Sequence, residues 1–297
     1  MTSHNHHHID SSSGRISVAF FLNFFFTIIE FIGGYLTNST AIMADAVHDL
    51  GDTLSIGLAW LLSKVSSKHP DDAFTYGYHR FSLLGALING VVLIAGSIWV
   101  LSEAIPRLTE PEMPHAQGML WLAILGICIN GYAAWKVSKG GTLNERILNW
   151  HLLEDVLGWV AVFIVSVILF FYEWPILDPV LSIAFTLFIL VNVLKNTKST
   201  ISLFLQSVPD KIILEKIQNA LKSIDHVSSI HHVHLWSMDG EHHVLTAHLE
   251  LDQMITPQEQ QVLKNKISVR LSALSLSHTT IEFEFPDEQC RDVDNAQ

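Results

Sequence analysis

Six long apolar stretches occupy the first two thirds of this chain and constrain its fold more than any other feature. Each is close to the roughly 20 residues that a helix needs to cross a lipid bilayer. The whole chain is 49% hydrophobic and only 15% charged, which agrees with a membrane protein. The sequence therefore predicts an α-helical membrane domain with six transmembrane helices, at roughly 16–36, 41–62, 81–105, 119–137, 148–171 and 176–193.

Basic residues are distributed unevenly between the two sides of these stretches. The connections on one side carry only Arg107. Those on the other side carry Arg15, Lys64, Lys68, Arg80, Lys136, Lys139, Arg146, Lys195 and Lys198. Because cytoplasmic loops are enriched in lysine and arginine, both ends of the chain are expected in the cytoplasm. The first stretch follows no basic segment with a small-residue cleavage site, so it is expected to be a retained helix.

The apolar stretches end before residue 206, and the periodicity of the chain then changes. Helical segments at 210–224 and 257–274 are interspersed with strand-like segments at 230–237, 244–251 and 280–285. The order αββαβ, with helices on one face of a small sheet, predicts a compact α+β domain with a ferredoxin-like fold. We expect a histidine-containing cytoplasmic N-terminal tail at 1–14, the six-helix transmembrane domain at 15–206, the cytoplasmic domain at 207–290 and a C-terminal tail at 291–297.

Two of the apolar stretches carry the same pair of ionisable residues at the same spacing. His48 and Asp52 lie in the second stretch, and His151 and Asp155 lie in the fifth. Residues four apart share one helix face, so each pair points an imidazole and a carboxylate the same way. Two imidazoles and two carboxylates suit tetrahedral zinc. An ionisable group at mid-membrane costs about 2.5–3.5 kcal/mol, so four of them predict a metal pathway rather than ordinary packing.

The second stretch leaves a choice between two ligand pairs. Asp45 and Asp49 share an arc of about 100° with His48 and Asp52 on a helical wheel, so spacing alone does not separate the pairs. The repeated His-x-x-x-Asp pattern of the fifth stretch favours His48 and Asp52. Asp45 and Asp49 would then hold the ligands through hydrogen bonds or carry protons. Glu154, about 60° from His151 on its helix, is assigned the same supporting role.

The depth of the ligands in the membrane gives a further prediction. The second stretch enters from outside and the fifth from inside, so the two helices are antiparallel. Asp52 should then lie level with His151, and His48 with Asp155. At a rise of about 1.5 Å per residue, these depths match only if the fifth helix begins well before its apolar run, near Leu143.

Several other residues are weaker candidates. Asp178 is expected to cap a helix at the outer interface. Glu30 has two open roles, a hydrogen bond to a neighbouring helix or a group that helps cations to enter. His69 and His79 could be metal ligands together with Asp71 and Asp72, but a solvated loop is the preferred assignment. The chain has only two cysteines, Cys128 and Cys290, which are too few for a disulfide framework.

The cytoplasmic part is rich in histidine. Its imidazoles are His231, His232, His234, His242, His243, His248 and His278. This concentration predicts zinc binding in the cytoplasm, with His231, His232, His234 and His248 among the candidate ligands. Along a regular strand His232 and His234 would face one way and His231 the other, so these residues cannot all serve one site.

The ligand types also predict a mechanism. Zinc binds deprotonated imidazole and carboxylate, so loading expels protons and reprotonation from outside expels zinc. The expected protein is a zinc/proton antiporter with alternating access around a fixed site, not an enzyme. A metallohydrolase would need an open zinc position and a general base. Glu154 could serve as that base, but the motif His-Glu-x-x-His is absent and four ligands close the shell. The remaining alternatives are a metal-sensing receptor anchored by its membrane part, or the same transporter with cadmium, cobalt or nickel as its main substrate.

These motifs together resemble the cation diffusion facilitator family, in the zinc-exporting branch of bacterial exporters related to vesicular zinc transporters. The resemblance covers nearly the whole chain and rests on His48-x-x-x-Asp52, the loop Thr75–Arg80, His151-x-x-x-Asp155, Asp178-Pro179 and the run His231–Trp236. It implies a homodimer joined partly through the cytoplasmic domains and embedded in the lipid of a bacterial inner membrane. It also implies export of divalent metal ions in exchange for protons. No nucleic-acid partner is expected.

The chain departs from some relatives in two places. Some hold a second metal in the loop after the second helix with a carboxylate and two histidines; Asp71 fits, but Phe74 and Tyr78 stand at the histidine positions. That site is expected to be lost. Others bind a metal pair in the cytoplasmic domain at positions that correspond here to His231, His248, Glu282 and Glu284. Glu282 replaces a histidine there, which favours a mononuclear site over a dinuclear one.

Overall fold

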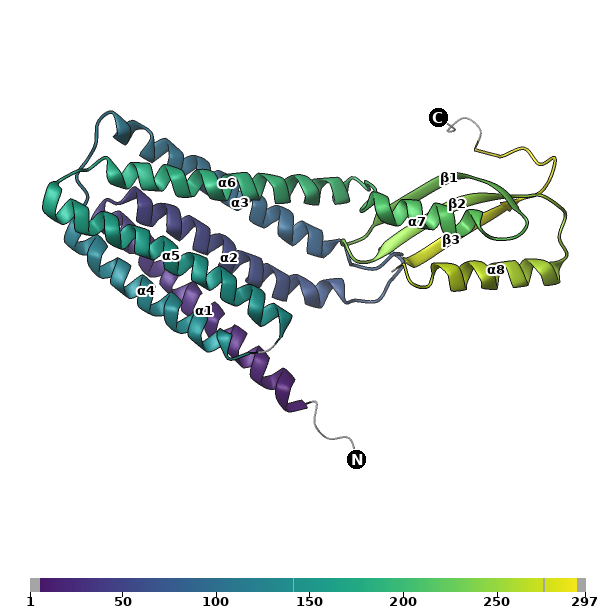
Figure 1. The fold of residues 1–297 in the computed structure, drawn as a ribbon, viewed down its shortest axis with the longest axis horizontal. Coiled ribbons are helices and arrows are strands. Elements are labelled where there is room, and N and C mark those ends of the chain that lie inside the picture. The colour runs from purple at the N-terminus through teal and green to yellow at the C-terminus, as the bar shows by residue number, and fades with distance from the viewer. Residues whose placement is uncertain (1–5, 141, 275, 293–297) are drawn as a thin grey trace. The chain divides into compact units, whose positions relative to one another are not determined.

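The chain divides into two compact units in the computed structural model, which describes residues 6–140, 142–274 and 276–292 (Figure 1). The first unit contains the chain up to Leu61 together with Gly85–Thr197. The second contains Leu62–Leu84 and the chain from Lys198 onward. The connection between the second and third helices therefore belongs structurally with the C-terminal domain.

The first unit is built from long helices. Their bounds are α1 His6–Thr37, α2 Thr40–Ser66, α3 Phe81–Ala104, α4 Ala116–Ser138, α5 Leu143–Tyr172 and α6 Leu177–Phe204, with a short 3-10 helix at Pro106–Leu108 (Figure 1). Among the described residues, α1, α3, α4, α5 and α6 are long and apolar enough to cross a membrane. The remaining helix, α2, has 27 residues but carries three aspartates. The predicted helical membrane fold is confirmed, with α2 as its polar member.

The start of α5 explains how its ligands reach their depth. The hydroxyl of Thr142 accepts the N–H of Glu145 at 3.2 Å, and the Glu145 carboxylate accepts the N–H of Thr142 at 3.0 Å. This capping box satisfies backbone groups that a helix end leaves unpaired. The helix thus begins at Leu143, before its apolar run, as the depth argument required.

Tight packing between α4 and α5 fixes the rotation of α5. Trp159 is fully buried, and a side chain at Gly126 of α4 would clash with its indole ring. Phe26 of α1 lies on the same indole, with ring centroids 5.3 Å apart. Trp159 is one turn beyond Asp155 and so shares its helix face. The packing that buries Trp159 therefore also sets the direction of Asp155.

Asp178 caps a helix, although not the one to which it belongs. It lies at the start of α6, is 1% exposed, and its carboxylate accepts four hydrogen bonds from the first residues of α2 and the serine before them. The donors are the Ser39 hydroxyl at 2.5 Å, the Thr40 N–H and hydroxyl at 2.7 and 2.8 Å, and the Ala41 N–H at 3.3 Å. A carboxylate at this position also interacts favourably with the positive, N-terminal end of the α2 helix dipole.

Substituting Asp178→Ala should therefore destabilise the membrane domain. Hydrogen bonds to a charged group contribute about 1.5–3 kcal/mol, so we expect a loss of about 2–3 kcal/mol, measured as a lower thermal unfolding midpoint in detergent. Asp210→Ala is the matched control, because it removes one exposed cap contact, to the Ile212 N–H at 2.7 Å, and should cost about 1 kcal/mol or less. Equal effects of the two substitutions would contradict the assignment.

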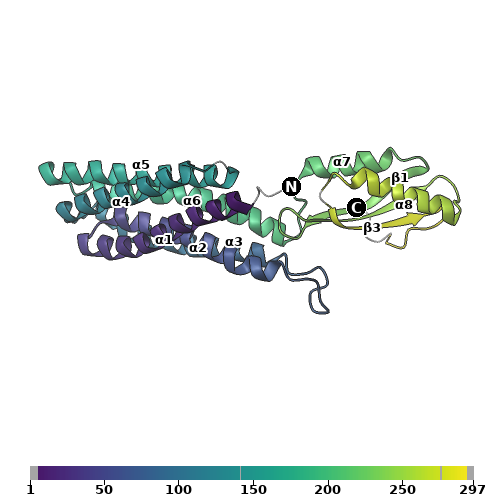
Figure 2. The same cartoon turned by 90° about the horizontal axis from the view of Figure 1, so that it is seen from below.

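The second unit confirms the predicted order of elements. It consists of α7 Lys211–Lys222, β1 Val227–Ser237, β2 His243–Leu251, α8 Pro257–Leu271 and β3 Leu276–Glu284. The sheet order is β1-β2-β3, with β1 antiparallel and β3 parallel to β2. Figure 2 shows α7 and α8 beside the sheet. Their apolar side chains share one core with the strands, which contains Ile217, Leu221, Leu245, Leu249, Leu263 and Ile267.

One irregularity in this sheet affects the histidines. The pairing of β1 with β2 shifts between His231 and His234, and His232 has a positive φ of 47°. A bulge of this kind re-aims side chains and breaks the strict alternation of a strand. The expectation that His231 faces away from His232 and His234 therefore does not hold at this point.

Candidate metal centres

Four side chains of α2 and α5 converge in the membrane unit. They are His48, Asp52, His151 and Asp155, whose potential ligand atoms all lie within 4.8 Å of one another. His151 Nε2 lies 2.7 Å from Asp52 Oδ2, and His48 Nε2 lies 3.7 Å from Asp155 Oδ1. His48 Nε2 is also 3.7 Å from Asp52 Oδ2. The predicted depth match, Asp52 with His151 and His48 with Asp155, is confirmed.

These distances fit one tetrahedral cation. Zinc bonds of about 2.0–2.2 Å place neighbouring ligand atoms about 3.3–3.6 Å apart. The separations of 2.7 and 3.7 Å lie on either side of that value, so small side-chain movements would complete the shell. Asp155 is 3% exposed, whereas the side chains of His48, Asp52 and His151 are 23–30% exposed. Asp155 is thus the buried member of the cluster, and the other three side chains are partly exposed.

The other acidic residues of this region lie outside the converging group. Asp45 and Asp49 are buried, and neither oxygen of Asp49 has a hydrogen-bond partner among the described residues. Glu30 of α1 is also fully buried, with both carboxylate oxygens unpaired in the described part of the chain. Glu154 Oε2 lies 3.9 Å from His151 Nδ1 on a side chain that is 71% exposed. These acids surround the converging four side chains without joining them.

A second group of potential ligands lies in the second unit. It consists of His231, His248, Glu284 and Cys290, again with ligand atoms within 4.8 Å. Glu284 lies between the two imidazoles, 2.9 Å from His231 Nε2 and 2.8 Å from His248 Nδ1. Cys290 Sγ lies 3.5 Å from His248 Nδ1. Burial alone would raise the pKa of Glu284, but contacts with Cys290, His248 and His231 hold it below its usual value, so it is a carboxylate at neutral pH.

The remaining predicted cytoplasmic ligands lie beside this group. Glu282 Oε2 is 3.7 Å from His248 Nε2 and forms an ion pair with Arg291. His232 packs its ring against His248 with centroids 5.0 Å apart, and with His234 and Glu282 it lines an adjacent cavity. Sequence reasoning missed Cys290, because it lies beyond the last strand and follows no repeated spacing. The only feature of the sequence that could have indicated Cys290 was its residue type, because thiolates bind zinc.

The loop before α3 uses Asp71 for its own structure. Asp71 accepts the Tyr78 hydroxyl at 2.6 Å and the N–H groups of Phe74 and Ala73 at 2.8 and 3.0 Å. The Tyr78 hydroxyl is the main cause that lowers the pKa of Asp71. Phe74 and Tyr78 pack against each other with centroids 4.5 Å apart. A carboxylate engaged in this way is in keeping with the expected loss of a metal site in this loop.

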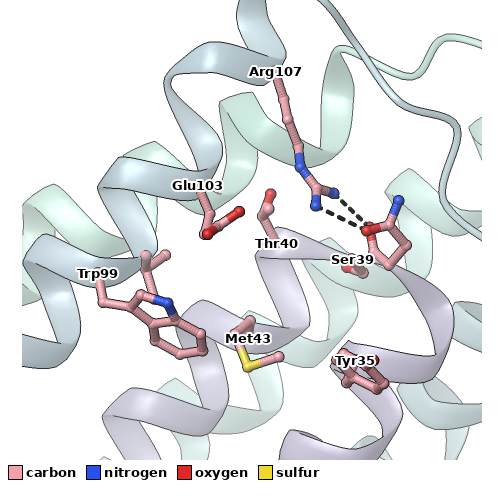
Figure 3. Close-up of a pocket in the computed structure, with 10 residues that line it drawn as sticks. Tyr35, Ser39, Thr40, Met43, Trp99, Glu103 and Arg107 are labelled. Carbon is pink, nitrogen blue, oxygen red and sulfur yellow. Dashed lines mark hydrogen bonds between the residues drawn. The ribbon is translucent and has the colours of Figure 1, made fainter.

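The pocket at the turn between α1 and α2 is lined by residues that stabilise this turn (Figure 3). Arg107 donates to the carbonyl oxygen and to Oδ1 of Asn38, both at 2.8 Å. Asn38 has a positive φ of 54°, which this clamp helps to hold. Glu103 is the only carboxylate among the residues that line the pocket, and it belongs to none of the metal-ligand groups of the described chain.

Comparison with protein families matches both units of the chain. Residues 16–205 match the cation efflux transmembrane domain, and residues 209–285 match the cytoplasmic domain of cation efflux proteins. The two matches together cover most of the 297 residues.

Curated relatives are similar over nearly their whole length. The cadmium, cobalt and zinc/H(+)-K(+) antiporter of Bacillus velezensis is 32% identical over 286 residues, which are 95% of this chain and 91% of the relative. The metal cation efflux system protein CzcD of Cupriavidus metallidurans is 30% identical over 296 residues, 99% and 93% of the two chains. The zinc transporter ZitB of Yersinia pseudotuberculosis is 32% identical over 281 residues, 93% and 89%.

Proposed function

The chain belongs to the cation efflux family, the cation diffusion facilitators, and we propose that it exports zinc from the cytoplasm in exchange for protons. Members of this family are secondary transporters and not enzymes. The observation that carries the proposal is the pairing across α2 and α5, which brings His48, Asp52, His151 and Asp155 within 4.8 Å of one another. Two imidazoles and two carboxylates form a closed tetrahedral shell for zinc, with no position left for a catalytic water.

Proton coupling follows from the same side chains. We infer that His151 is an imidazolium in the metal-free protein and donates its Nε2 proton to Asp52 Oδ2 across the contact of 2.7 Å. Zinc needs the bare nitrogen and oxygen, so binding releases that proton, and reprotonation from the outer side releases the metal. The buried carboxylates of Asp45, Asp49 and Glu30 accept protons near the site. Glu154 helps to orient His151 through its contact with Nδ1 of that residue.

The membrane arrangement is proposed on the loop charges and the family. The transmembrane domain spans residues 15–206 in a bacterial inner membrane, with both termini and the domain at 207–290 in the cytoplasm. Two copies associate through their cytoplasmic domains. Residues 1–5 and 293–297 of the expected terminal tails lie outside the described structure, and α1 extends back to His6 into the expected N-terminal tail.

Transport into proteoliposomes tests this function directly. Purified protein is reconstituted with a zinc-sensitive dye inside the vesicles, and a pH gradient is imposed across the membrane. We expect zinc influx that rises with an acidic interior and stops when the gradient is collapsed. Parallel runs with cadmium and cobalt establish the preferred metal. Absence of any metal flux from well-folded protein would favour the alternative of a metal-sensing receptor, and zinc-dependent hydrolysis without flux would favour a metallohydrolase.

The cytoplasmic cluster is proposed to regulate transport. Zinc held by His231, His248 and Glu284, with Cys290 completing the shell in place of Glu282, stiffens the cytoplasmic domains of the dimer. His232 and His234 flank this site, and Glu282 orients His248 from its other nitrogen. The transport site has its own full ligand set, so this zinc is not a step in the pathway.

The double substitution His231→Ala and His248→Ala should raise the zinc concentration for half-maximal flux by about three- to tenfold. The maximal rate should remain within about twofold, because a coupling free energy of about 0.7–1.4 kcal/mol acts on affinity. Initial rates across a zinc titration in proteoliposomes measure both quantities. His226→Ala, on an exposed histidine of the same domain, is the control. Abolished flux at saturating zinc would show that the domain is structurally obligatory instead.

A further inference from the structure

A third group of metal-binding side chains lies where the α2–α3 connection meets the turn between β1 and β2. It consists of His79, Asp239 and His242, whose potential ligand atoms lie within 4.8 Å of one another. All three residues belong to the second structural unit. The sequence assigned His79 to a solvated loop, but its side chain is only 33% exposed and its ring lies 4.6 Å from that of His242.

Asp239 is prepared to act as an anionic ligand. Its Oδ1 accepts the N–H groups of His242 and Glu241 at 2.8 and 2.9 Å, which fixes the carboxylate and leaves Oδ2 pointing at the histidines. The side chain is 14% exposed. Burial alone would raise the pKa of Asp239, but the N–H groups of His242 and Glu241 and the His242 imidazole hold it below its usual value. The group is therefore ionised at neutral pH.

Each of the two histidines directs its Nδ1 atom at Asp239 Oδ2. His242 Nδ1 lies 2.6 Å from Asp239 Oδ2, and His79 Nδ1 lies 3.4 Å from it. Ligand atoms on tetrahedral zinc are about 3.3–3.6 Å apart. The distance between His79 Nδ1 and Asp239 Oδ2 therefore already suits two ligands of one zinc ion. His242 would move back by less than about 1 Å to match it. Two imidazoles and a carboxylate leave one position for water.

The loop that carries His79 is held in place by other contacts. Tyr76 packs against Trp236 and His278 with centroids 5.6 and 4.9 Å apart, and the Arg80 guanidinium lies 4.9 Å from the Trp236 ring. Gly77 has a positive φ of 79°, which allows the loop to turn there. The ligands are thus brought together before any metal arrives, which lowers the entropic cost of binding.

We propose that His79, Asp239 and His242 form a zinc site that fastens the α2–α3 connection to the β1–β2 turn. Zinc from the cytoplasm would reach it through the partly exposed faces of His79 and His242, which are 33% and 45% exposed. The metal ion would join the α2–α3 connection to the sheet of the same structural unit. The proposal concerns binding and does not rest on the transport function.

Zinc content of the full-length protein tests the proposal. The starting variant lacks the other two centres through His48→Ala, His151→Ala, His231→Ala and His248→Ala. After equilibrium dialysis against micromolar zinc in detergent, metal analysis should show one zinc fewer per protomer when His79→Ala or His242→Ala is added. The paired difference is the readout, because the N-terminal histidines can hold zinc of their own. His69→Ala, on the same connection, should leave the content unchanged.

Asp239→Asn separates loss of metal from loss of fold. The amide oxygen can still accept the two N–H groups, but the charge that binds the cation is gone. We expect this variant to keep its thermal unfolding midpoint in chelator and to lose the same zinc ion. Unchanged zinc content in the His79→Ala, His242→Ala and Asp239→Asn variants would overturn the proposal and leave a hydrogen-bonded His-Asp-His contact in its place.

Discussion

Alanine in place of His48, Asp52, His151 or Asp155 is expected to abolish proton-driven zinc transport, with a loss of more than about 100-fold in initial rate. Removing a partner that only orients a metal ligand already costs about 10–100-fold, and each of these side chains is itself a proposed ligand. The measurement is zinc influx into proteoliposomes under a fixed pH gradient, normalised to the amount of reconstituted protein.

Membrane insertion should survive each substitution. An ionisable group inside a bilayer costs free energy, so its removal does not oppose insertion of α2 or α5. The packing that sets the rotation of α5, Trp159 against Gly126, is untouched. Detergent extraction followed by size-exclusion chromatography would verify this. Normal flux in any one variant would remove that residue from the site.

Asp49→Ala provides the comparison that resolves the two ligand pairs. Asp49 is fully buried near the site but outside the converging group, so its variant should retain partial transport. The expected order of rates is wild type, then Asp49→Ala, then Asp52→Ala. Complete loss in Asp49→Ala, with an active Asp52→Ala, would move the ligands to Asp45 and Asp49.

Features that repeat at a fixed spacing could be predicted from the sequence. The helical membrane fold, the αββαβ order and the start of α5 near Leu143 follow from apolar length, periodicity and helix rise. The contact of Asp52 with His151 also followed, because two antiparallel helices of known pitch leave little freedom in depth. Each of these inferences needs only local geometry.

Features that depend on contacts between distant segments could not be predicted. Asp178 was recognised as a cap, but nothing in its neighbourhood indicates that it caps α2 rather than its own helix. Cys290 reaches His248 from beyond the last strand, and the bulge at His232 changes which histidines share a face. His79 and His242 are separated by more than 160 residues. The spacing of residues along the sequence does not indicate such contacts.

The proposed zinc preference should weaken when His48 becomes a carboxylate. His48 Nε2 lies 3.7 Å from both Asp52 Oδ2 and Asp155 Oδ1, so this imidazole faces both carboxylates of the site. His48→Asp leaves one imidazole and three carboxylates, a set that suits harder ions such as manganese and tolerates the larger cadmium ion. We expect the ratio of zinc to manganese flux to fall at least about tenfold, which corresponds to about 1.4 kcal/mol of lost discrimination.

Competition in proteoliposomes measures this ratio directly. Zinc flux is followed while manganese or cadmium is added outside, and each competitor is also tested alone. His48→Glu extends the carboxylate further and guards against a side chain too short to reach the metal. His48→Gln controls for loss of the imidazole without added charge and should lose zinc transport with no gain of manganese. An unchanged preference for zinc over both competitors in active His48→Asp and His48→Glu variants would place selectivity outside this residue, with His151 as the remaining imidazole of the site.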